Sequence, residues 1–256
     1  MFIIQANDPA GAWLQLNKTM LNAGALQPLR LGNRHMVPNV TLEIKDWNGE
    51  YSRIVPLNEL GYNPRLRMGR LERNYLNVES LQKCRTYMDG RRPDRHSTHG
   101  LIFGTGKKKT PPCMVGAMFY FSPTQLYVNV FIRASEVTKT LGADFHFLNS
   151  VFQRAVPDWM YAKLGLVRIH LGLAYNLAQW FPLFDMIAPG FKLEPEKYRF
   201  HDMCMQSIGK ARNVNGYQSK WKPERRMHLR YRERIPQFLA DNKGRIIQGP
   251  SFFPCP

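Results

Sequence analysis

The chain has 256 residues, of which 44% are hydrophobic and 12% are aromatic. This size and composition predict one large domain over residues 1–256, with a basic C-terminal segment at 205–256. They argue against a membrane protein, because no apolar run reaches the roughly 18 residues that a span needs. The N-terminal residues also lack the pattern of a signal peptide.

The formal net charge is +17. Such an excess of positive charge predicts polyanionic partners, either nucleic acid or the phosphates of nucleotides. Solubility alone also explains it.

The four cysteines show neither a Cys-x-x-Cys pair nor the spacing of a metal site, so no metal is expected. They indicate free thiols in a reducing cytoplasm. The four are Cys84, Cys113, Cys204 and Cys255.

The first third of the chain is predicted to hold a short helix followed by a hairpin. Apolar residues over 10–20 favour the helix. The alternation over 40–45 predicts a strand, and Asp46-Trp-Asn-Gly predicts a turn from which the chain returns over 51–55. Arg34 lies just before this hairpin, where its simplest interpretation is a surface charge.

Residues 64–88 carry apolar side chains at helical spacing among many arginines. Glu72 is one of the few acids there, and an ion pair one helical turn away is its simplest interpretation. The following stretch, 89–110, is polar, basic and rich in glycine. Its Gly104-Thr-Gly-Lys-Lys-Lys-Thr sequence does not match a nucleotide phosphate loop, so a basic loop is the favoured interpretation.

Two nearly continuous apolar runs, 114–121 and 126–133, predict strands that are buried at the centre of a sheet. Ser122-Pro-Thr-Gln separates them as a turn. Three further elements are predicted after them: a helix at 144–156, a buried strand at 164–171 and a helix at 174–187.

The segment 210–234 interleaves lysines and arginines with Tyr217, Trp221 and Tyr231. Base stacking combined with phosphate contacts would use such residues. A solvated basic tail explains the pattern equally well.

Cys113 follows two prolines, which hold the backbone extended at the entry to the first of the two central strands. Basic residues are abundant nearby, which favours the reactive thiolate form. The alternative is a small buried apolar residue.

Several short motifs around this cysteine resemble the thymidylate synthase superfamily. They are Pro112-Cys113-Met114, Met118-Phe119-Tyr120, Arg133-Ala-Ser-Glu136, Leu141-Gly-Ala-Asp144 and, more weakly, Ile169-His-Leu-Gly-Leu-Ala-Tyr-Asn176. The spacings agree with the family as well, with 133 − 113 = 20 residues from the cysteine to the arginine and 144 − 133 = 11 from there to the aspartate.

The resemblance implies an α/β (α+β) fold of three layers, with a mostly mixed or antiparallel sheet and packed helices, assembled as a homodimer. It implies that the Cys113 thiolate adds to C6 of a pyrimidine nucleotide, so that C5 takes a one-carbon unit from 5,10-methylenetetrahydrofolate. Glu72 is then the best candidate for the catalytic glutamate.

The same resemblance assigns the substrate-binding residues. Arg133 matches the phosphate-binding arginine, since a guanidinium pairs with a phosphate in a bidentate manner. Arg95, with Arg92 as its rival, matches the arginine that reaches the partner subunit's nucleotide. Three further candidates complete the predicted substrate site: Arg34 for the phosphate, and Ser135 and Tyr175.

Asp144 stands where the synthases have an asparagine that pairs with uracil. An ionised carboxylate only accepts hydrogen bonds, so it suits the exocyclic amine of cytosine and a shared proton at N3. The cytidylate hydroxymethylases of the superfamily carry aspartate here. The resemblance thus implies a hydroxymethylase for a cytosine nucleotide, as used by phages that modify their DNA, acting in the host cytoplasm.

Three alternatives stay open. Asp144 alone is also explained as the N-cap of a helix that begins at Phe145. The enzyme could methylate a uracil nucleotide, as a synthase does. The chain could also be a basic protein that binds or modifies nucleic acid on the same fold, through the segment 210–234.

Overall fold

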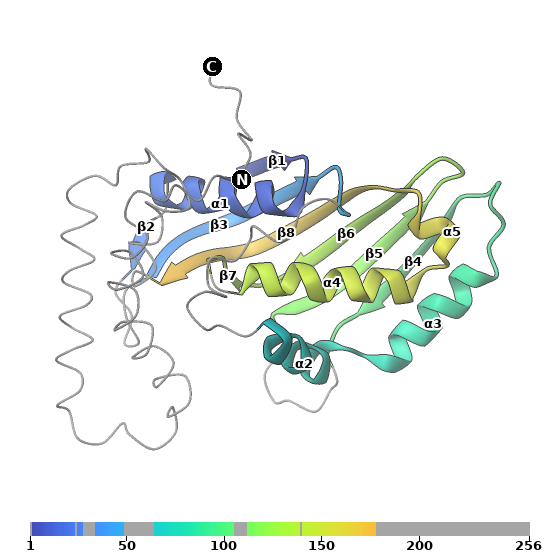
Figure 1. The fold of residues 1–256 in the computed structure, drawn as a ribbon. Coiled ribbons are helices and arrows are strands. Elements are labelled where there is room, and N and C mark those ends of the chain that lie inside the picture. Colours follow the sequence, from blue (N-terminus) through green and yellow to red (C-terminus); the bar gives the residue numbers. More distant parts are fainter. Residues whose placement is uncertain are drawn as a thin grey trace.

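The computed structural model describes residues 2–23, 25–27, 34–48, 64–104, 112–138 and 140–177 (Figure 1). Three predictions lie outside the described residues. These are the return strand at 51–55, most of the helix at 174–187, and the basic segment 205–256 with its stretch 210–234.

The described residues form helices and strands in alternation. The elements are β1 (Phe2–Ala6), α1 (Pro9–Ala23), β2 (Ala25–Gln27), β3 (Arg34–Ile44), α2 (Pro64–Tyr75), α3 (Val78–Asp89), β4 (Ser97–Ile102), β5 (Met114–Phe121), β6 (Leu126–Ile132), β7 (Ser135–Glu136), α4 (Leu141–Ala155), α5 (Asp158–Tyr161) and β8 (Leu164–Leu177).

The strands make one mixed sheet in the order β1-β3-β8-β6-β5-β4, with β2 added to β3 and β7 added to β8. Pairing is antiparallel for β3 with β8, β5 with β6 and β4 with β5. It is parallel for β1 with β3, β6 with β8 and β7 with β8. The predicted α/β class with a mixed sheet is confirmed.

The helices cover one face of this sheet. α1 packs on β1, β3 and β8, and α4 contacts α1, α2 and α3, so these helices share one layer (Figure 1). Of the three layers predicted, the described residues form two. None of the described helices is long and apolar enough to cross a membrane.

Aromatic side chains fill the space between the helices and the sheet. Trp47 packs edge-on against Phe145, with ring centroids 5.6 Å apart, and lies 5.5 Å from Phe152. Phe152 in turn meets Phe119 of β5. Phe152 therefore anchors the C-terminal half of α4 on the sheet, and Trp47 links Phe145 and Phe152 to the loop that follows β3.

The two central strands are confirmed, but they are not buried on both faces. In β5 and β6, buried and exposed residues alternate, and the exposed positions include Tyr120, Tyr127 and Phe131. Continuous apolar composition does not distinguish a doubly covered strand from one whose outer face carries aromatic side chains.

The predicted hairpin after residue 40 is wrong in its pairing. Over residues 40–44 both edges of β3 are occupied, by β1 on one side and β8 on the other. These partners are distant in sequence, and a local turn signal cannot report them.

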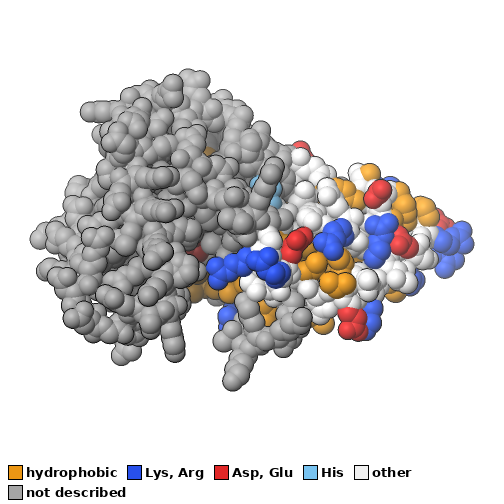
Figure 2. Space-filling model, turned by 60° about the horizontal axis from the view of Figure 1, so that its bottom comes forward, with side chains coloured by type: hydrophobic (Ala, Val, Ile, Leu, Met, Phe, Trp, Pro, Cys, Tyr) orange, Lys and Arg blue, Asp and Glu red, His pale blue; other side chains and the backbone are white. Residues whose placement is uncertain are grey.

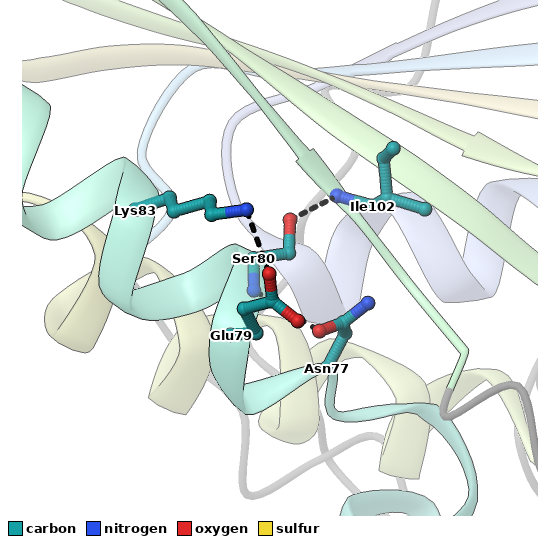
Figure 3. Close-up of polar contacts among 5 residues, drawn as sticks. All are labelled: Asn77, Glu79, Ser80, Lys83 and Ile102. Carbon is teal, nitrogen blue, oxygen red and sulfur yellow. Dashed lines mark hydrogen bonds and ion pairs between the residues drawn. The ribbon is translucent and has the colours of Figure 1, made fainter.

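The single helix predicted over 64–88 is two helices. Asn77 adopts an extended conformation, and its side-chain oxygen accepts a hydrogen bond from the Ser80 amide at 3.0 Å (Figure 3). It therefore caps α3 and separates it from α2. The Ser80 hydroxyl accepts a bond from the Ile102 amide at 2.9 Å, which holds the start of α3 against β4.

Two more boundaries differ from prediction. The helix expected at 144–156 begins earlier, at Leu141. The strand expected at 164–171 continues to Leu177, because its second half pairs with β3 on one side and β7 on the other. Residues 174–177 of the predicted final helix are therefore strand.

Charged side chains of both signs are interspersed on the described part of the face that Figure 2 turns toward the reader. The excess positive charge of the chain is therefore not gathered into one continuous patch on that part of the surface. On the helices α2, α3 and α4, ion pairs join several charged side chains: Lys83 with Glu79, Arg85 with Asp89, and Arg154 with Glu72.

Candidate active site

Two irregularities in neighbouring strand pairs lie beside each other toward one end of the sheet. The pairing of β5 with β6 shifts between Met114 and Gly116. The pairing of β3 with β8 steps over Gly172 and over Asn39, whose φ is positive at 54°. A Cβ on Gly172 would lie 2.8 Å from the Arg133 carbonyl oxygen. Bulges re-aim nearby side chains, and the predicted site residues lie beside these irregularities.

Cys113 lies at the entry to β5 and is partly buried. Its carbonyl oxygen accepts a hydrogen bond from the Arg133 amide at 2.7 Å. The two residues that the family spacing picks out are thus adjacent across the β5–β6 pair. The Arg133 side chain itself is exposed.

Tyr75, at the C-terminal end of α2, is hydrogen-bonded to the Cys113 side chain. Burial raises the pKa of the Tyr75 hydroxyl to about 12, with further contributions from the charge of Cys113, from this hydrogen bond and from the charge of Asp144. The hydroxyl therefore keeps its proton at neutral pH and is available as a donor to the thiolate.

Gly104 holds Tyr75 at this place. Its amide donates a hydrogen bond to the Tyr75 carbonyl oxygen at 2.8 Å. Its φ is +105°, and a Cβ there would lie 2.9 Å from Cγ of Pro112, the residue before the cysteine. Only glycine allows this residue to lie so close to the Pro112 ring while it bonds to the end of α2.

Asp144 is buried in the first turn of α4, where the positive end of the helix dipole favours a carboxylate. The Ser135 hydroxyl donates a hydrogen bond to its Oδ2 at 3.1 Å. Its own amide already bonds to the Thr140 carbonyl oxygen. Asp144 is therefore inside the helix, and the alternative that made it an N-cap is wrong.

The structure thus brings four side chains into one cluster. Cys113 is joined to Tyr75 by a hydrogen bond. Tyr75 interacts electrostatically with Asp144, which accepts a hydrogen bond from Ser135. Cys113, Asp144 and Ser135 are among the site residues that the sequence predicts. The sequence does not predict Tyr75 as a site residue, because there it is one of several apolar side chains on the face of a predicted helix.

Tyr175 and Arg34 lie at the same end of the sheet as this cluster. Tyr175 is partly buried in β8 and lies opposite Glu136 of β7 and Met36 of β3. Arg34 is the first residue of β3 and lies opposite Leu177. Their predicted roles toward the substrate stay predictions.

Glu72 is on α2 but makes a different contact. Its carboxylate lies 3.7 Å from the Arg154 guanidinium, and both side chains are about half exposed. Arg154 is ten residues beyond Asp144 on α4, about 15 Å along the helix. The pair differs from the expected contact within one helical turn, and the catalytic role of Glu72 stays a prediction.

Arg92 and Arg95 are exposed in the turn between α3 and β4. Arg92 pairs with Asp94 at 3.3 Å. Because β4 is antiparallel to β5, this turn lies near Phe121, about 26 Å along β5 from Cys113. Neither arginine belongs to this cluster, and the predicted contact with a partner's nucleotide stays a prediction.

No family model and no curated protein matches the sequence. Among solved structures the chain is similar to a thermostable thymidylate synthase A from Bacillus subtilis, with 11% sequence identity and a TM-score of 0.47. The similarity covers 70% of this chain and 83% of that one. At this identity and score the likeness does not assign a function.

Proposed function

We propose that the chain is a transferase that attaches a one-carbon unit to C5 of a cytosine nucleotide, through a covalent bond between Cys113 and C6. The observation that carries the proposal is the Tyr75 hydroxyl, which bonds to the Cys113 side chain and lies within the electrostatic reach of Asp144. Cys113 as nucleophile and the buried Asp144 as base-binding group would therefore contact the same pyrimidine ring.

The thiolate supplies what an aromatic ring lacks. When Sγ adds to C6, the electron pair of the C5–C6 double bond moves to C5, which becomes a carbon nucleophile. Tyr75 donates its hydrogen bond to the thiolate before addition, because its hydroxyl stays protonated at neutral pH. We assign proton handling at the thiol to Tyr75, since Glu72 is paired with Arg154.

Asp144 selects the base. A carboxylate held by the Ser135 hydroxyl has one oxygen fixed and can accept from the exocyclic amine of cytosine with the other. It would repel O4 of uracil. Burial strengthens this discrimination, because water cannot replace the missing partner.

The phosphate and the one-carbon donor complete the proposal. Arg133 binds the phosphate, with Arg34 in support and Tyr175 toward the sugar. Because Cys113 is only partly buried, a second reactant can approach the ring from outside. Methylenetetrahydrofolate supplies the one-carbon unit when bound. C5 then loses its proton, and water adds to the new carbon as the Cys113 thiolate leaves C6, which gives the hydroxymethyl product.

We further propose that the exposed face of the sheet pairs with a second copy of this chain. Two of its described charged groups pair with each other, since Arg168 Nε donates to Glu43 Oε1 at 2.7 Å. A large positive charge on the chain opposes self-association, but the described residues of this face include this neutral pair and several aromatic side chains. The exposed apolar residues on it are Ile102, Val115, Tyr120, Tyr127 and Phe131. In such a homodimer, Arg95 or Arg92 would reach the partner's nucleotide.

Release of tritium from C5 tests the proposal. With methylenetetrahydrofolate present, 5-tritiated dCMP or CMP should release label faster than 5-tritiated dUMP, and Cys113→Ala should abolish the release. Faster release from dUMP would instead support a synthase. Salt-sensitive binding of DNA or RNA that survives Cys113→Ala, with no release from any nucleotide, would support the nucleic-acid-binding alternative.

A further inference from the structure

A fully buried polar network surrounds Thr138, in the chain between β7 and α4. Asn17 of α1 and Asn176 of β8 are completely buried, and so, nearly, is Thr138. The Thr138 hydroxyl donates to Asn17 Oδ1 at 2.9 Å, and Asn176 Nδ2 donates to the same oxygen at 3.2 Å. The Thr138 amide donates to Asn176 Oδ1 at 3.0 Å.

Helix α1 closes this network from the other side. Asn17 Nδ2 donates to the Trp13 carbonyl oxygen at 2.8 Å, which fixes the direction of the amide group. Trp13 Nε1 donates to the Val137 carbonyl oxygen, also at 2.8 Å. Two consecutive residues, Val137 and Thr138, are therefore clamped to α1 and β8.

Val137 and Thr138 lie in the chain between Ser135, which donates the hydrogen bond, and Asp144, which accepts it. β7, which carries Ser135, has only two residues and offers little pairing of its own. Beyond the clamp, Thr140 bonds to the Glu136 carbonyl oxygen through both its amide and its hydroxyl. The Asp144 amide then bonds to the Thr140 carbonyl oxygen. The position of the turn thus sets where Ser135 and Asp144 meet.

We propose that Thr138, held by Asn17 and Asn176, is a positioning residue for base selection. It keeps the Ser135 hydroxyl on Asp144 Oδ2, and thereby sets the orientation in which the carboxylate meets the nucleotide. This inference rests on the proposed function, because it gives Asp144 the role of base reader. Thr138 itself does not touch the base.

The test compares Thr138→Val, which keeps the shape of the side chain and removes the hydroxyl, with Thr138→Ser, which keeps the hydroxyl. Ile44→Val is the matched control, a completely buried position at the far end of β3. Titration calorimetry on the full chain gives the dissociation constants for dCMP and dUMP. Hydrogen exchange followed by mass spectrometry gives the protection of the segment 135–144.

Thr138→Val should reduce the preference for dCMP over dUMP about three- to tenfold, the factor that one net hydrogen bond is worth. Exchange of the segment 135–144 should quicken by a similar factor. Thr138→Ser should keep the wild-type nucleotide preference and the wild-type exchange rate. Ile44→Val should also leave both quantities unchanged, although it destabilises the fold. Unchanged selectivity in Thr138→Val would overturn the inference.

Failure of the proposed function gives a different result. If the wild-type chain binds neither nucleotide, or prefers dUMP, the proposed role of Asp144 is wrong. The exchange measurement still decides whether Thr138 positions the turn, because it needs no nucleotide. Wild-type protection of the segment 135–144 in Thr138→Val would overturn that role on its own.

Discussion

Replacing Tyr75 with phenylalanine removes the one hydroxyl that bonds to the Cys113 side chain and leaves the ring in place. The pKa of that hydroxyl is raised to about 12, so at neutral pH it is a donor toward the thiolate. Without it the thiolate loses a charge-assisted hydrogen bond in a partly buried site. The reactivity of the sulfur toward electrophiles should fall.

The size of the effect follows from two opposing terms. A hydrogen bond to a charged group contributes about 1.5–3 kcal/mol, which is a factor of about 10 to 100 in an equilibrium constant. A less stabilised thiolate is intrinsically more nucleophilic, and this recovers about half of the loss on a logarithmic scale. The alkylation rate of Cys113 should therefore fall about three- to tenfold.

Iodoacetamide labelling at pH 7, followed by peptide mass spectrometry, measures this rate. Cys204 and Cys255 are replaced with serine in every variant to simplify the readout. Cys84 serves as the internal unreactive thiol, because burial raises its pKa to about 12. A rate that is unchanged or higher in Tyr75→Phe would refute the assignment of Tyr75 as a donor.

Tyr161→Phe is the matched control. Its hydroxyl lies 2.6 Å from both Asn149 Oδ1 and Asn48 Oδ1, away from Cys113. The variant also removes the hydroxyl of a partly buried, hydrogen-bonded tyrosine. An equal fall in the Cys113 rate in both variants would show that the effect comes from general loosening of the fold.

Four further outcomes are expected. Asp144→Asn should shift the nucleotide preference from dCMP toward dUMP in competition binding, and an unchanged preference would exclude Asp144 from base recognition. Gly104→Ala should lower the free energy of unfolding by about 1–3 kcal/mol in urea titration, because alanine is strained at positive φ. Burial lowers the pKa of both His146 and His170, so the unfolded chain binds more protons, and stability should fall as the pH drops below about 6.5. Replacing both histidines with glutamine should flatten that pH dependence. Phe131→Asp should turn a dimer into a monomer in sedimentation experiments, and a monomeric wild type would exclude the proposed pairing.

The central strands could be predicted from the sequence because their signal is local. Apolar runs bounded by Pro112 and by Ser122-Pro-Thr-Gln gave β5 to the residue and β6 to within one residue. The pairing of β3 could not be predicted in this way. Its partners β1 and β8 lie far away in the chain, and the turn signal after Ile44 pointed to a hairpin instead.

In the candidate site, too, residues with a local sequence signal could be predicted, and a residue that depends on distant contacts could not. Cys113, Arg133 and Asp144 were accessible from the sequence because they stand at fixed spacings within a short stretch. Tyr75 was not, since its contact with the cysteine depends on the helix break at Asn77 and on the close approach at Gly104. Those features bring together elements that a sequence pattern treats separately.

A crystal structure of the chain soaked with dCMP tests the central claim most directly. We expect one pyrimidine ring with Cys113 Sγ at C6, the Asp144 carboxylate at the N3 and N4 edge, and the Arg133 guanidinium on the phosphate. A nucleotide bound elsewhere, or a ring that meets the thiol while Asp144 stays turned away from it, would show that these three residues do not form one substrate site.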